Sequence, residues 1–416
     1  MTHFASHGYI RAADDTLSVE PACQPGGVAK VFEPAFYIAI SGASVSFGRF
    51  PMNFMWGNPP WRREHKMETP ALVSSNPDVA VVGGGLTGVS AAYHLARRGL
   101  RATVVEACRI GDGASGRTGG IALEGTARGV KEGADTCLAT LERVVRDERI
   151  ECGLRLEGCW EIQHQGPGTP LPWDDGGKQI HIAKTVPGGI VDPMAMLYGI
   201  ARAAIREGAV IHENARVRRV VEKPARLELD GAVIEPGFVV IAANAWISSL
   251  VPAARAVGSA LTFACATEPL DSSTLDELGL GAGIPFYTID LPYLWGRETS
   301  DHRVIFGAGL SFGSPAELEA MDTNSAEPSA VLDALEARVR RLNPVLRDVR
   351  FSARWAGPIA IPEDFTPILG RLPEAPNVLV AGGYSGHGVA LSVHAGALIA
   401  RAIIDGTPLP AWGSVL

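Results

Sequence analysis

The stretch Val79-Ala-Val-Val-Gly83-Gly84-Gly85-Leu86-Thr87-Gly88 begins with four apolar residues and continues with glycines at G-x-G-x-x-G spacing. The apolar run is typical of a buried parallel strand. At this spacing the first glycine permits a tight turn, the second lets the backbone approach a pyrophosphate, and the third lets the next helix pack on the strand. The stretch therefore predicts a strand–turn–helix unit that binds a dinucleotide.

The residues that follow complete this unit. A helix is expected over 86–98, stopped by Gly99, and its N-terminus offers free N–H groups to phosphates. A second strand over 102–105 ends at Glu106, whose carboxylate is placed to accept ribose hydroxyls and disfavours a 2′-phosphate. The unit alone does not distinguish NAD from FAD, and a glycine-rich turn without a ligand is the alternative interpretation.

A second glycine-rich segment lies roughly 300 residues later. The strand Val378-Leu-Val-Ala is followed by Gly382-Gly-Tyr-Ser-Gly386-His387-Gly388 and a helix over 389–404. The N-terminus of that helix would direct its dipole and N–H groups at the loop and stabilise negative charge on a reduced flavin ring. Together the two segments indicate FAD, held by a domain assembled from both ends of the chain.

Composition narrows the class of protein. With 416 residues, 46% of them hydrophobic, the chain is long enough for two domains. A net charge of −8 without a long basic run argues against a nucleic-acid partner, and no apolar run reaches the length of a transmembrane helix. Six cysteines lack CxxC pairs and zinc spacing, so we expect free thiols, a reducing cytoplasmic location and no metal site.

The organisation of the chain follows from these segments. Residues 1–74 are expected to be a partly disordered N-terminal extension, for which an upstream start codon is one explanation. Within it, Trp56 and Trp61 indicate that 55–75 pack on the domain. Asp192 followed by Pro193 predicts a helix start. The predicted fold is α/β, with a Rossmann-like FAD-binding domain (75–125, 185–255 and 346–416) and an α+β substrate or lid domain, an antiparallel mixed sheet (126–184 and 256–345).

Five further segments occur in a fixed order along the chain: Gly113–Gly120, Gly189–Pro193, Ala242–Trp246, Pro367–Gly370 and Gly382–Gly388. In these segments the chain resembles the D-amino-acid-oxidase-like FAD oxidoreductases, which include glycine oxidase, sarcosine oxidase and γ-glutamylputrescine oxidase. The run Ala114-Ser115-Gly116-Arg117-Thr-Gly119-Gly120 looks most like the γ-glutamylputrescine-oxidase-like branch.

The resemblance implies a set of cofactor-binding residues and a chemistry. Hydride moves from the substrate carbon to flavin N5, and water hydrolyses the resulting imine; this requires orientation and a neutral amine more than a strong base. The implied cofactor-binding residues are Gly83, Gly85, Leu86, Thr87, Gly88, Glu106, Ala107, Ser115, Gly116, Arg117, Gly119, Gly120, Val217, Ala243, Trp246, Gly357, Gly386, His387, Gly388 and Val389.

Two positions depart from relatives that bind an amino-acid carboxylate. Ile359 stands where glycine-oxidase-like members carry an arginine, and Ala390 where sarcosine-oxidase-like members carry a lysine. Each lost charge-assisted bond is worth roughly 1.5–3 kcal/mol. Residues 350–370 contain no cysteine and Arg117 replaces the histidine of covalent members, so we expect noncovalent FAD.

The departures favour oxidation of an amine without an α-carboxylate, of the polyamine or γ-glutamyl-amine type, with O2 or another electron acceptor. The candidate catalytic residues are His387, Arg297 and Tyr287. Arg297, Arg303 or Arg354 would supply a relocated carboxylate clamp, which leaves an α-amino-acid or N-methyl-amino-acid oxidase as an alternative. A non-catalytic flavin-binding partner subunit is a further alternative, whereas an NAD-dependent dehydrogenase would not explain 382–388.

Overall fold

The computed structural model describes residues 54–61, 67, 69–252 and 257–413. Residues 1–53 of the predicted N-terminal extension lie outside the described residues. The predicted packing of the segment after them is confirmed: Trp56 and Trp61 are buried, and the indole nitrogen of Trp61 donates to the carbonyl of Gly116 at 2.9 Å. Within the described residues, no helix has both the length and the hydropathy of a membrane span.

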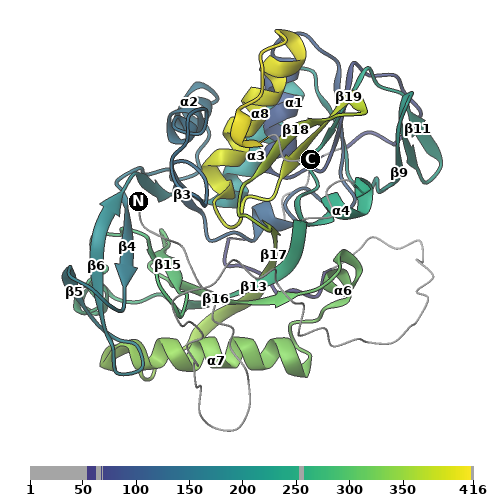
Figure 1. The fold of residues 1–416 in the computed structure, drawn as a ribbon. Coiled ribbons are helices and arrows are strands. Elements are labelled where there is room, and N and C mark those ends of the chain that lie inside the picture. The colour runs from purple at the N-terminus through teal and green to yellow at the C-terminus, as the bar shows by residue number, and fades with distance from the viewer. Residues whose placement is uncertain (1–53, 62–66, 68, 253–256, 414–416) are drawn as a thin grey trace, which may run out of the picture. The chain divides into compact units, whose positions relative to one another are not determined.

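A six-stranded sheet contains the predicted dinucleotide unit and draws on both ends of the chain (Figure 1). Strand β1 (Val79–Val82) pairs in parallel with β2 (Ala102–Val105) on one side and with β12 (Phe238–Ile241) on the other. The order is β18-β19-β12-β1-β2-β8, with the remaining strands at β8 (Val210–His212), β18 (Ile368–Leu372) and β19 (Ala375–Gly382). The prediction of a Rossmann-like FAD-binding fold assembled from both ends is confirmed.

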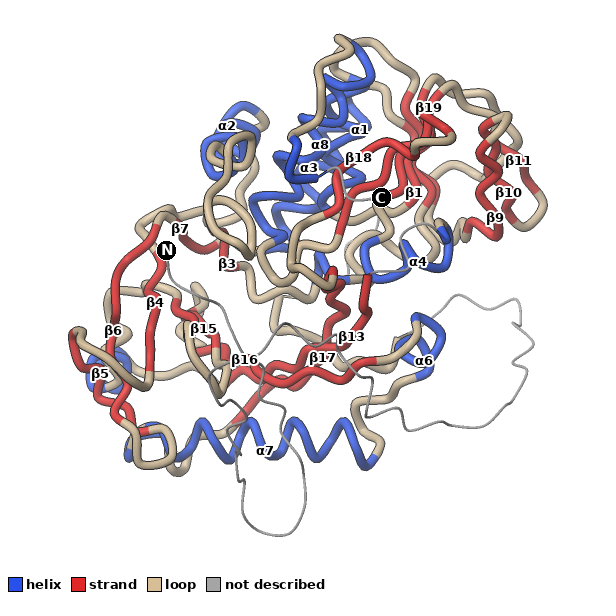
Figure 2. Tube along the Cα trace, viewed as in Figure 1, coloured by secondary structure: helices blue, strands red, loops and turns tan. Residues whose placement is uncertain are grey.

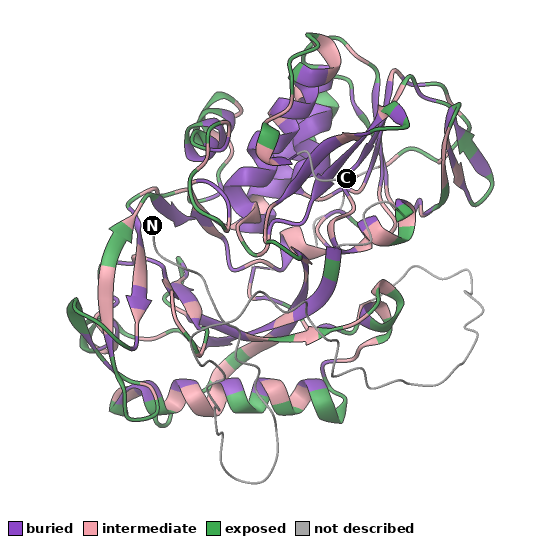
Figure 3. Ribbon diagram, viewed as in Figure 1, coloured by how far each residue is buried: buried purple, intermediate pink, exposed green. Residues whose placement is uncertain are grey.

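The two faces of this sheet bury alternate residues, as strand geometry requires. Val79 and Val81 face a core shared with the helices α1 (Leu86–Ala96), α3 (Pro193–Arg206) and α8 (Gly388–Ile404). Ala80 and Val82 face a second core shared with the small sheet β9 (Val217–Glu222), β10 (Ala225–Leu229) and β11 (Ala232–Ile234). Because both faces are covered, the central strands β1 and β12 are apolar throughout, and this part of the sheet appears buried in Figure 3.

A second sheet of eight strands forms the other layer and is antiparallel except where β14 pairs in parallel with β4. The long helix α7 (Ala326–Leu342) packs on it through Leu335 and Val339 (Figure 2). The strand order is β17 (Phe351–Pro362), β13 (Val257–Thr267), β16 (Val304–Phe312), β15 (Trp295–Glu298), β14 (Phe286–Thr288), β4 (Cys159–Gln163), β6 (Gln179–Val186) and β5 (Thr169–Asp174).

The remaining elements are short, apart from α2. They are the paired strands β3 (Ile121–Leu123) and β7 (Gly188–Ile190), and the helices α2 (Cys137–Asp147), α4 (Ile247–Leu250), α5 (Ser272–Glu277) and α6 (Pro315–Ala320). The predicted start of α3 is confirmed, because the Asp192 carboxylate accepts the main-chain N–H groups of Met194 and Ala195 at 3.0 and 2.9 Å.

Two elements fall on the other side of the expected domain boundaries. Strand β17 lies within 346–416, expected in the FAD-binding domain, yet it pairs along its whole length with β13 of the eight-stranded sheet. Helix α2 lies within 126–184, expected in the lid, yet Leu141 and Val144 belong to the core around α1, α3 and α8. In both cases the partner is far away in sequence, so local pattern carried no information about which layer the element joins.

A buried charged cluster holds the far edge of the eight-stranded sheet. The imidazole of His164 bonds Asp290 at 2.7 Å and Asp175 at 2.8 Å, and Arg338 of α7 pairs with Asp175 at 2.6 Å. Burial alone would lower the pKa of His164, but the two carboxylates outweigh it and the pKa is raised. Burial likewise opposes the ionised Asp175, yet His164 and Arg338 lower its pKa to about 2.

This cluster gives the protein a pH-dependent stability. A histidine whose pKa is higher in the folded than in the unfolded protein adds to the free energy of unfolding. This contribution is complete below the pKa of the unfolded state, about 6.5, and is lost as pH rises through the pKa of the folded state. We expect His164→Gln to lower the free energy of unfolding by about 2 kcal/mol at pH 6 and by less at pH 9. Chemical unfolding of the FAD-loaded protein at both pH values measures the difference.

His302→Gln is the matched control, because His302 also bonds a carboxylate, that of Glu298, but its side chain is 59% exposed. The control should change stability little at either pH. A loss in His164→Gln that is equal at pH 6 and pH 9 would contradict the assignment.

Candidate active site

The turn after β1 has the close contacts that its glycines predict. Gly83 has a φ of +110°, and a Cβ added there would lie 2.6 Å from the carbonyl oxygen of Ala242. A Cβ on Gly88 would lie 1.9 Å from the carbonyl oxygen of Gly83. Only glycine fits at either position, so the main chain runs flat at the end of β1 and α1 begins directly behind it.

Two side chains fix this turn. Ser115 accepts the main-chain N–H of Leu86, the first residue of α1, at 2.9 Å. Glu106 accepts the N–H groups of Gly84 at 2.6 Å and Cys108 at 2.9 Å. Burial raises the pKa of Glu106, and these two amides oppose that shift. The residues expected to contact the ADP half of the cofactor thus lie close to one another.

The start of β9 joins the same place. The main-chain N–H of Ala215 donates to the carbonyl of Glu106 at 2.8 Å, which brings Val217, the residue expected beside adenine, close to the acid and to Ala107. Val217 is buried in the core below the turn. The residues expected around adenosine therefore converge although they come from three separate segments.

The second glycine segment meets the first through a hydrogen bond that the sequence did not suggest. The phenol of Tyr384 lies 2.9 Å from the hydroxyl of Thr87, and both side chains are buried. Ser385 and Gly386 follow with φ values of +50° and +90°. Next to this loop, Asn244 accepts the N–H of Gly383 at 3.3 Å, which brings Ala243 into the same neighbourhood.

The segment 113–120 lies against a strand of the eight-stranded sheet. A Cβ on Gly119 would lie 2.2 Å from the ring of Trp295, and one on Gly120, with a φ of +74°, would lie 2.2 Å from the carbonyl oxygen of Val191. The carbonyl oxygen of Gly116 accepts a hydrogen bond from the indole N–H of Trp61. Small residues are required here because an aromatic ring and the main chain approach closely.

Arg297, a candidate catalytic residue, is engaged by main-chain carbonyls. Its guanidinium donates to Gly119, to Glu298 at 3.0 Å and to Val191 at 3.3 Å, and it stacks over the ring of Trp61. Burial lowers its pKa to about 10. These bonds hold segment 113–120 and Val191 to the sheet, and a contact between Arg297 and substrate stays a prediction.

Two expected cofactor residues, Arg117 and Trp246, direct their side chains elsewhere, and a third, Gly357, packs on Arg117. Arg117 is buried and donates to the carbonyls of Asp112 at 2.9 Å and Gly57 at 2.7 Å. Trp246 donates to Glu319 at 2.6 Å and stacks with Trp56. A Cβ on Gly357 would lie 3.1 Å from Cβ of Arg117. Any cofactor contact from Arg117 or Trp246 must therefore come from the main chain or from a ring edge.

The other two candidate catalytic residues are neighbours. The rings of Tyr287 and His387 meet edge-on with their centroids 6.3 Å apart. The phenol of Tyr287 donates to Glu161 at 2.8 Å, and Lys184 pairs with the same carboxylate at 3.1 Å. Burial, followed by the bond to Glu161, raises the pKa of Tyr287. Burial lowers the pKa of His387, so its imidazole is neutral near pH 7.

The two substituted positions flank the same loop. A Cβ on Gly386 would lie 3.9 Å from Cδ1 of Ile359, so the residue at the former arginine position borders the glycine loop. Ala390 is fully buried in the first turn of α8. The sequence analysis missed the roles of Glu161 and Tyr384. Glu161 lies in no recognisable motif, and Tyr384, although it lies within 382–388, is identified only by its bond to Thr87.

The assembled residues fit FAD. The glycine turn and Glu106 suit the adenosine diphosphate half. At the other end, Nδ1 of His387 and Oγ of Ser385 are buried without a hydrogen-bond partner among the described residues. The polar edge of a flavin ring placed at this loop, next to the N-terminus of α8, could supply hydrogen bonds to such unpartnered polar atoms.

Comparison with known proteins agrees with this geometry. Residues 78–402 match the model of a family described as FAD dependent oxidoreductase (DAO), and the chain belongs to this family. It is 29% identical to a probable oxidoreductase OrdL of Haemophilus influenzae, over 82% of this chain and 86% of that one. It is 28% identical to γ-glutamylputrescine oxidoreductase of Escherichia coli, over 78% and 83%.

The fold also matches solved structures. Glycine oxidase from Geobacillus kaustophilus superposes with a TM-score of 0.66 at 21% identity, covering 82% of this chain and 98% of that one. The protein is thus an FAD-dependent oxidoreductase, and the resemblance drawn from the sequence is confirmed.

The role of Glu106 can be tested by cofactor affinity. We expect Glu106→Gln to weaken FAD binding about 10- to 100-fold, because an amide places a donor against N–H groups and loses the charge. The dissociation constant is measured from flavin fluorescence on titrating the apoprotein.

The control is Glu213→Gln. Glu213 is a nearby carboxylate that also accepts a main-chain N–H, that of Ile110, at 2.8 Å. It should change the affinity for FAD by less than about threefold. Equal losses in the two variants would show a general effect of charge instead of a contact with the cofactor.

Proposed function

We propose that the protein oxidises a C–N bond of an amine without an α-carboxylate, of the polyamine or γ-glutamyl-amine type. The observation that carries this proposal is Ile359 next to Gly386. An apolar side chain there cannot supply the charge-assisted, bidentate bond by which an arginine binds a carboxylate.

The alternative carboxylate clamps named from the sequence are already engaged. Arg297 donates to three main-chain carbonyls. Arg303 pairs with Asp301 at 2.8 Å and donates to the carbonyl of Thr267 at 3.3 Å. Arg354 pairs with Asp333 at 2.6 Å and donates to Ser329 at 3.2 Å. Freeing any of them would break these bonds, which argues against a relocated arginine.

The charge beside the candidate residues also suits a cationic substrate. Glu161 is bonded to Tyr287, which meets His387 at the glycine loop. Lys184 pairs with the same carboxylate at 3.1 Å and offsets part of its charge, but the acceptor oxygens of Glu161 still suit an ammonium group better than a carboxylate. The likeness to a γ-glutamylputrescine oxidoreductase points the same way.

The chain's own residues would orient the substrate. Bound FAD would supply the hydride acceptor. Nδ1 of His387 has no hydrogen-bond partner among the described residues, so with Oγ of Ser385 facing the flavin ring it would accept a hydrogen bond from the substrate amine. Tyr287 restricts the position of the imidazole ring. An amine held in this way keeps its lone pair for the developing imine.

We further propose that FAD is held noncovalently in a reducing compartment. The five described cysteines are unpaired and buried, and burial raises the pKa of Cys152 to about 11 and that of Cys137 to about 12. Such thiols are poor nucleophiles toward a flavin. FAD should therefore leave the protein on acid precipitation.

The substrate class is tested by anaerobic reduction of the bound flavin, read as bleaching near 450 nm. Putrescine, spermidine and γ-glutamylputrescine should bleach it, whereas glycine, sarcosine and proline should not. Bleaching by the amino acids alone would favour the α-amino-acid or N-methyl-amino-acid oxidase. Bleaching by none of them would support a non-catalytic flavin-binding subunit.

Ile359 gives a test by gain of function. We expect Ile359→Arg to raise kcat/KM for glycine or sarcosine at least about tenfold, since one charge-assisted bond is worth roughly 1.5–3 kcal/mol. Activity on diamines should fall, because the new cation repels them. Steady-state assays with both substrate classes measure the change.

The control is Ile359→Gln, which has a polar side chain of similar size without the charge. It should not raise activity on amino acids. An equal gain in both variants would mean that polarity at the site, and not a carboxylate clamp, sets the preference.

A further inference from the structure

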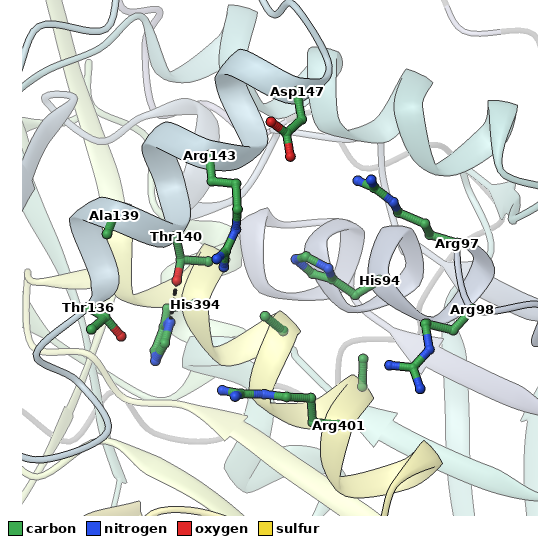
Figure 4. Close-up of a pocket in the computed structure, with 12 residues that line it drawn as sticks. His94, Arg97, Arg98, Thr136, Ala139, Thr140, Arg143, Asp147, His394 and Arg401 are labelled. Atoms are coloured by element: carbon green, nitrogen blue, oxygen red, sulfur yellow. Dashed lines mark hydrogen bonds between the residues drawn. The ribbon is translucent and has the colours of Figure 1, made fainter.

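A pocket of about 600 Å³ lies in the helix layer, bounded by α1, α2 and α8 (Figure 4). It is separate from the glycine loops. His94 follows the first residue of α1 by eight positions, about 12 Å along the axis, and Arg401 follows the first residue of α8 by thirteen, about 20 Å. Its volume is within the range of roughly 300–1,000 Å³ that is usual for small-molecule sites.

The pocket is strongly cationic although the chain carries a net charge of −8. Four arginines and one carboxylate, Asp147, line it. Two of the arginines have local explanations, because Arg97 pairs with Glu148 at 3.6 Å and Arg98 with Asp405 at 2.9 Å. Both also stand at the C-terminal end of α1, where a cation compensates the helix dipole.

The other two arginines are exposed side chains without a protein partner among the described residues. Arg143 of α2 and Arg401 of α8 form no ion pair and no side-chain hydrogen bond with any residue in the described part of the chain. Figure 4 shows them on different helices, with His94 of α1 between the helices. Two unpaired guanidinium forks at one pocket suit bidentate binding of a carboxylate or phosphate group.

His94 is an independent sign of an anion site. Its Nε2 is buried and lacks a hydrogen-bond partner within the described residues. Burial, and then the charges of Arg143, Arg97 and Arg401, lower its pKa to about 4. The ring thus experiences a positive potential that a bound anion would relieve, and its nitrogen could then donate to that anion.

We propose that this pocket binds a small multivalent oxyanion, either a phosphate ester or a polycarboxylate, between Arg143 and Arg401. Both chemistries present the planar oxygen pairs that guanidinium groups bind. The site is distinct from the cofactor turn and does not depend on which amine the enzyme oxidises.

The test is isothermal titration of the FAD-loaded protein with sodium pyrophosphate and, separately, with citrate, at ionic strength held constant with sodium chloride. We expect saturable binding at one site. Arg143→Ala with Arg401→Ala should weaken it at least about tenfold, and Arg143→Lys with Arg401→Lys, which keeps the charge but not the fork, should weaken it less.

The matched control removes two arginines elsewhere, Arg341→Ala with Arg347→Ala, which are exposed and have no ion pair among the described residues. It should bind as the parent protein does. Binding of only one of the two anions would support the site and identify its chemistry.

Three results would overturn the proposal. The first is that neither anion shows saturable binding up to about 10 mM. The second is unchanged anion affinity in the double alanine variant, and the third is release of FAD in proportion to the pyrophosphate bound. The last result would mean that the probe occupies the cofactor turn.

Discussion

The close contact between α1 and α8 is the constraint on which the site depends. Gly396 makes it possible, because a Cβ there would lie 2.5 Å from the main-chain nitrogen of Ala91 and from Oγ of Ser90. Ser90 in turn donates to the carbonyl of Val393 at 2.7 Å. Each helix follows a strand of the six-stranded sheet, so packing them together brings two glycine turns from opposite ends of the chain into one site, where Thr87 and Tyr384 meet.

The part of this arrangement that is local was predictable from the sequence. The run from Val79 to Gly88 and the Asp192 cap each form where the pattern places them, because their geometry is set within one turn of chain. Helix α2 and strand β17 joined layers that the sequence did not indicate. An apolar face or an apolar strand shows that an element is buried, but not against which partner. Strand β13 is more than 80 residues from β17, and the helices around α2 are more than 40 residues from it.

The roles of polar side chains were harder still to predict from the sequence. Glycines carry a signal of their own because the backbone needs them, whereas an arginine has the same appearance in sequence whether it binds substrate or the main chain. Arg117 and Arg297 both proved to be buried donors to carbonyl oxygens. Glu161 had no motif at all, and it matters only because Tyr287 of a distant strand bonds to it.

The position of Arg297 links the two sheets to the chemistry. Trp295, two residues earlier, lies between Gly119 and Gly307, so the strand β15 is fixed to the segment 113–120 by ring contact as well as by the guanidinium. Arg297, which could have bound a carboxylate, therefore holds the eight-stranded sheet to the segment 113–120. With Ile359 apolar and His387 neutral, the carboxylate that Tyr287 joins to this wall is that of Glu161, which also pairs with Lys184. For the proposed amine, such a wall attracts a distant ammonium group and leaves the reacting nitrogen uncharged next to the imidazole.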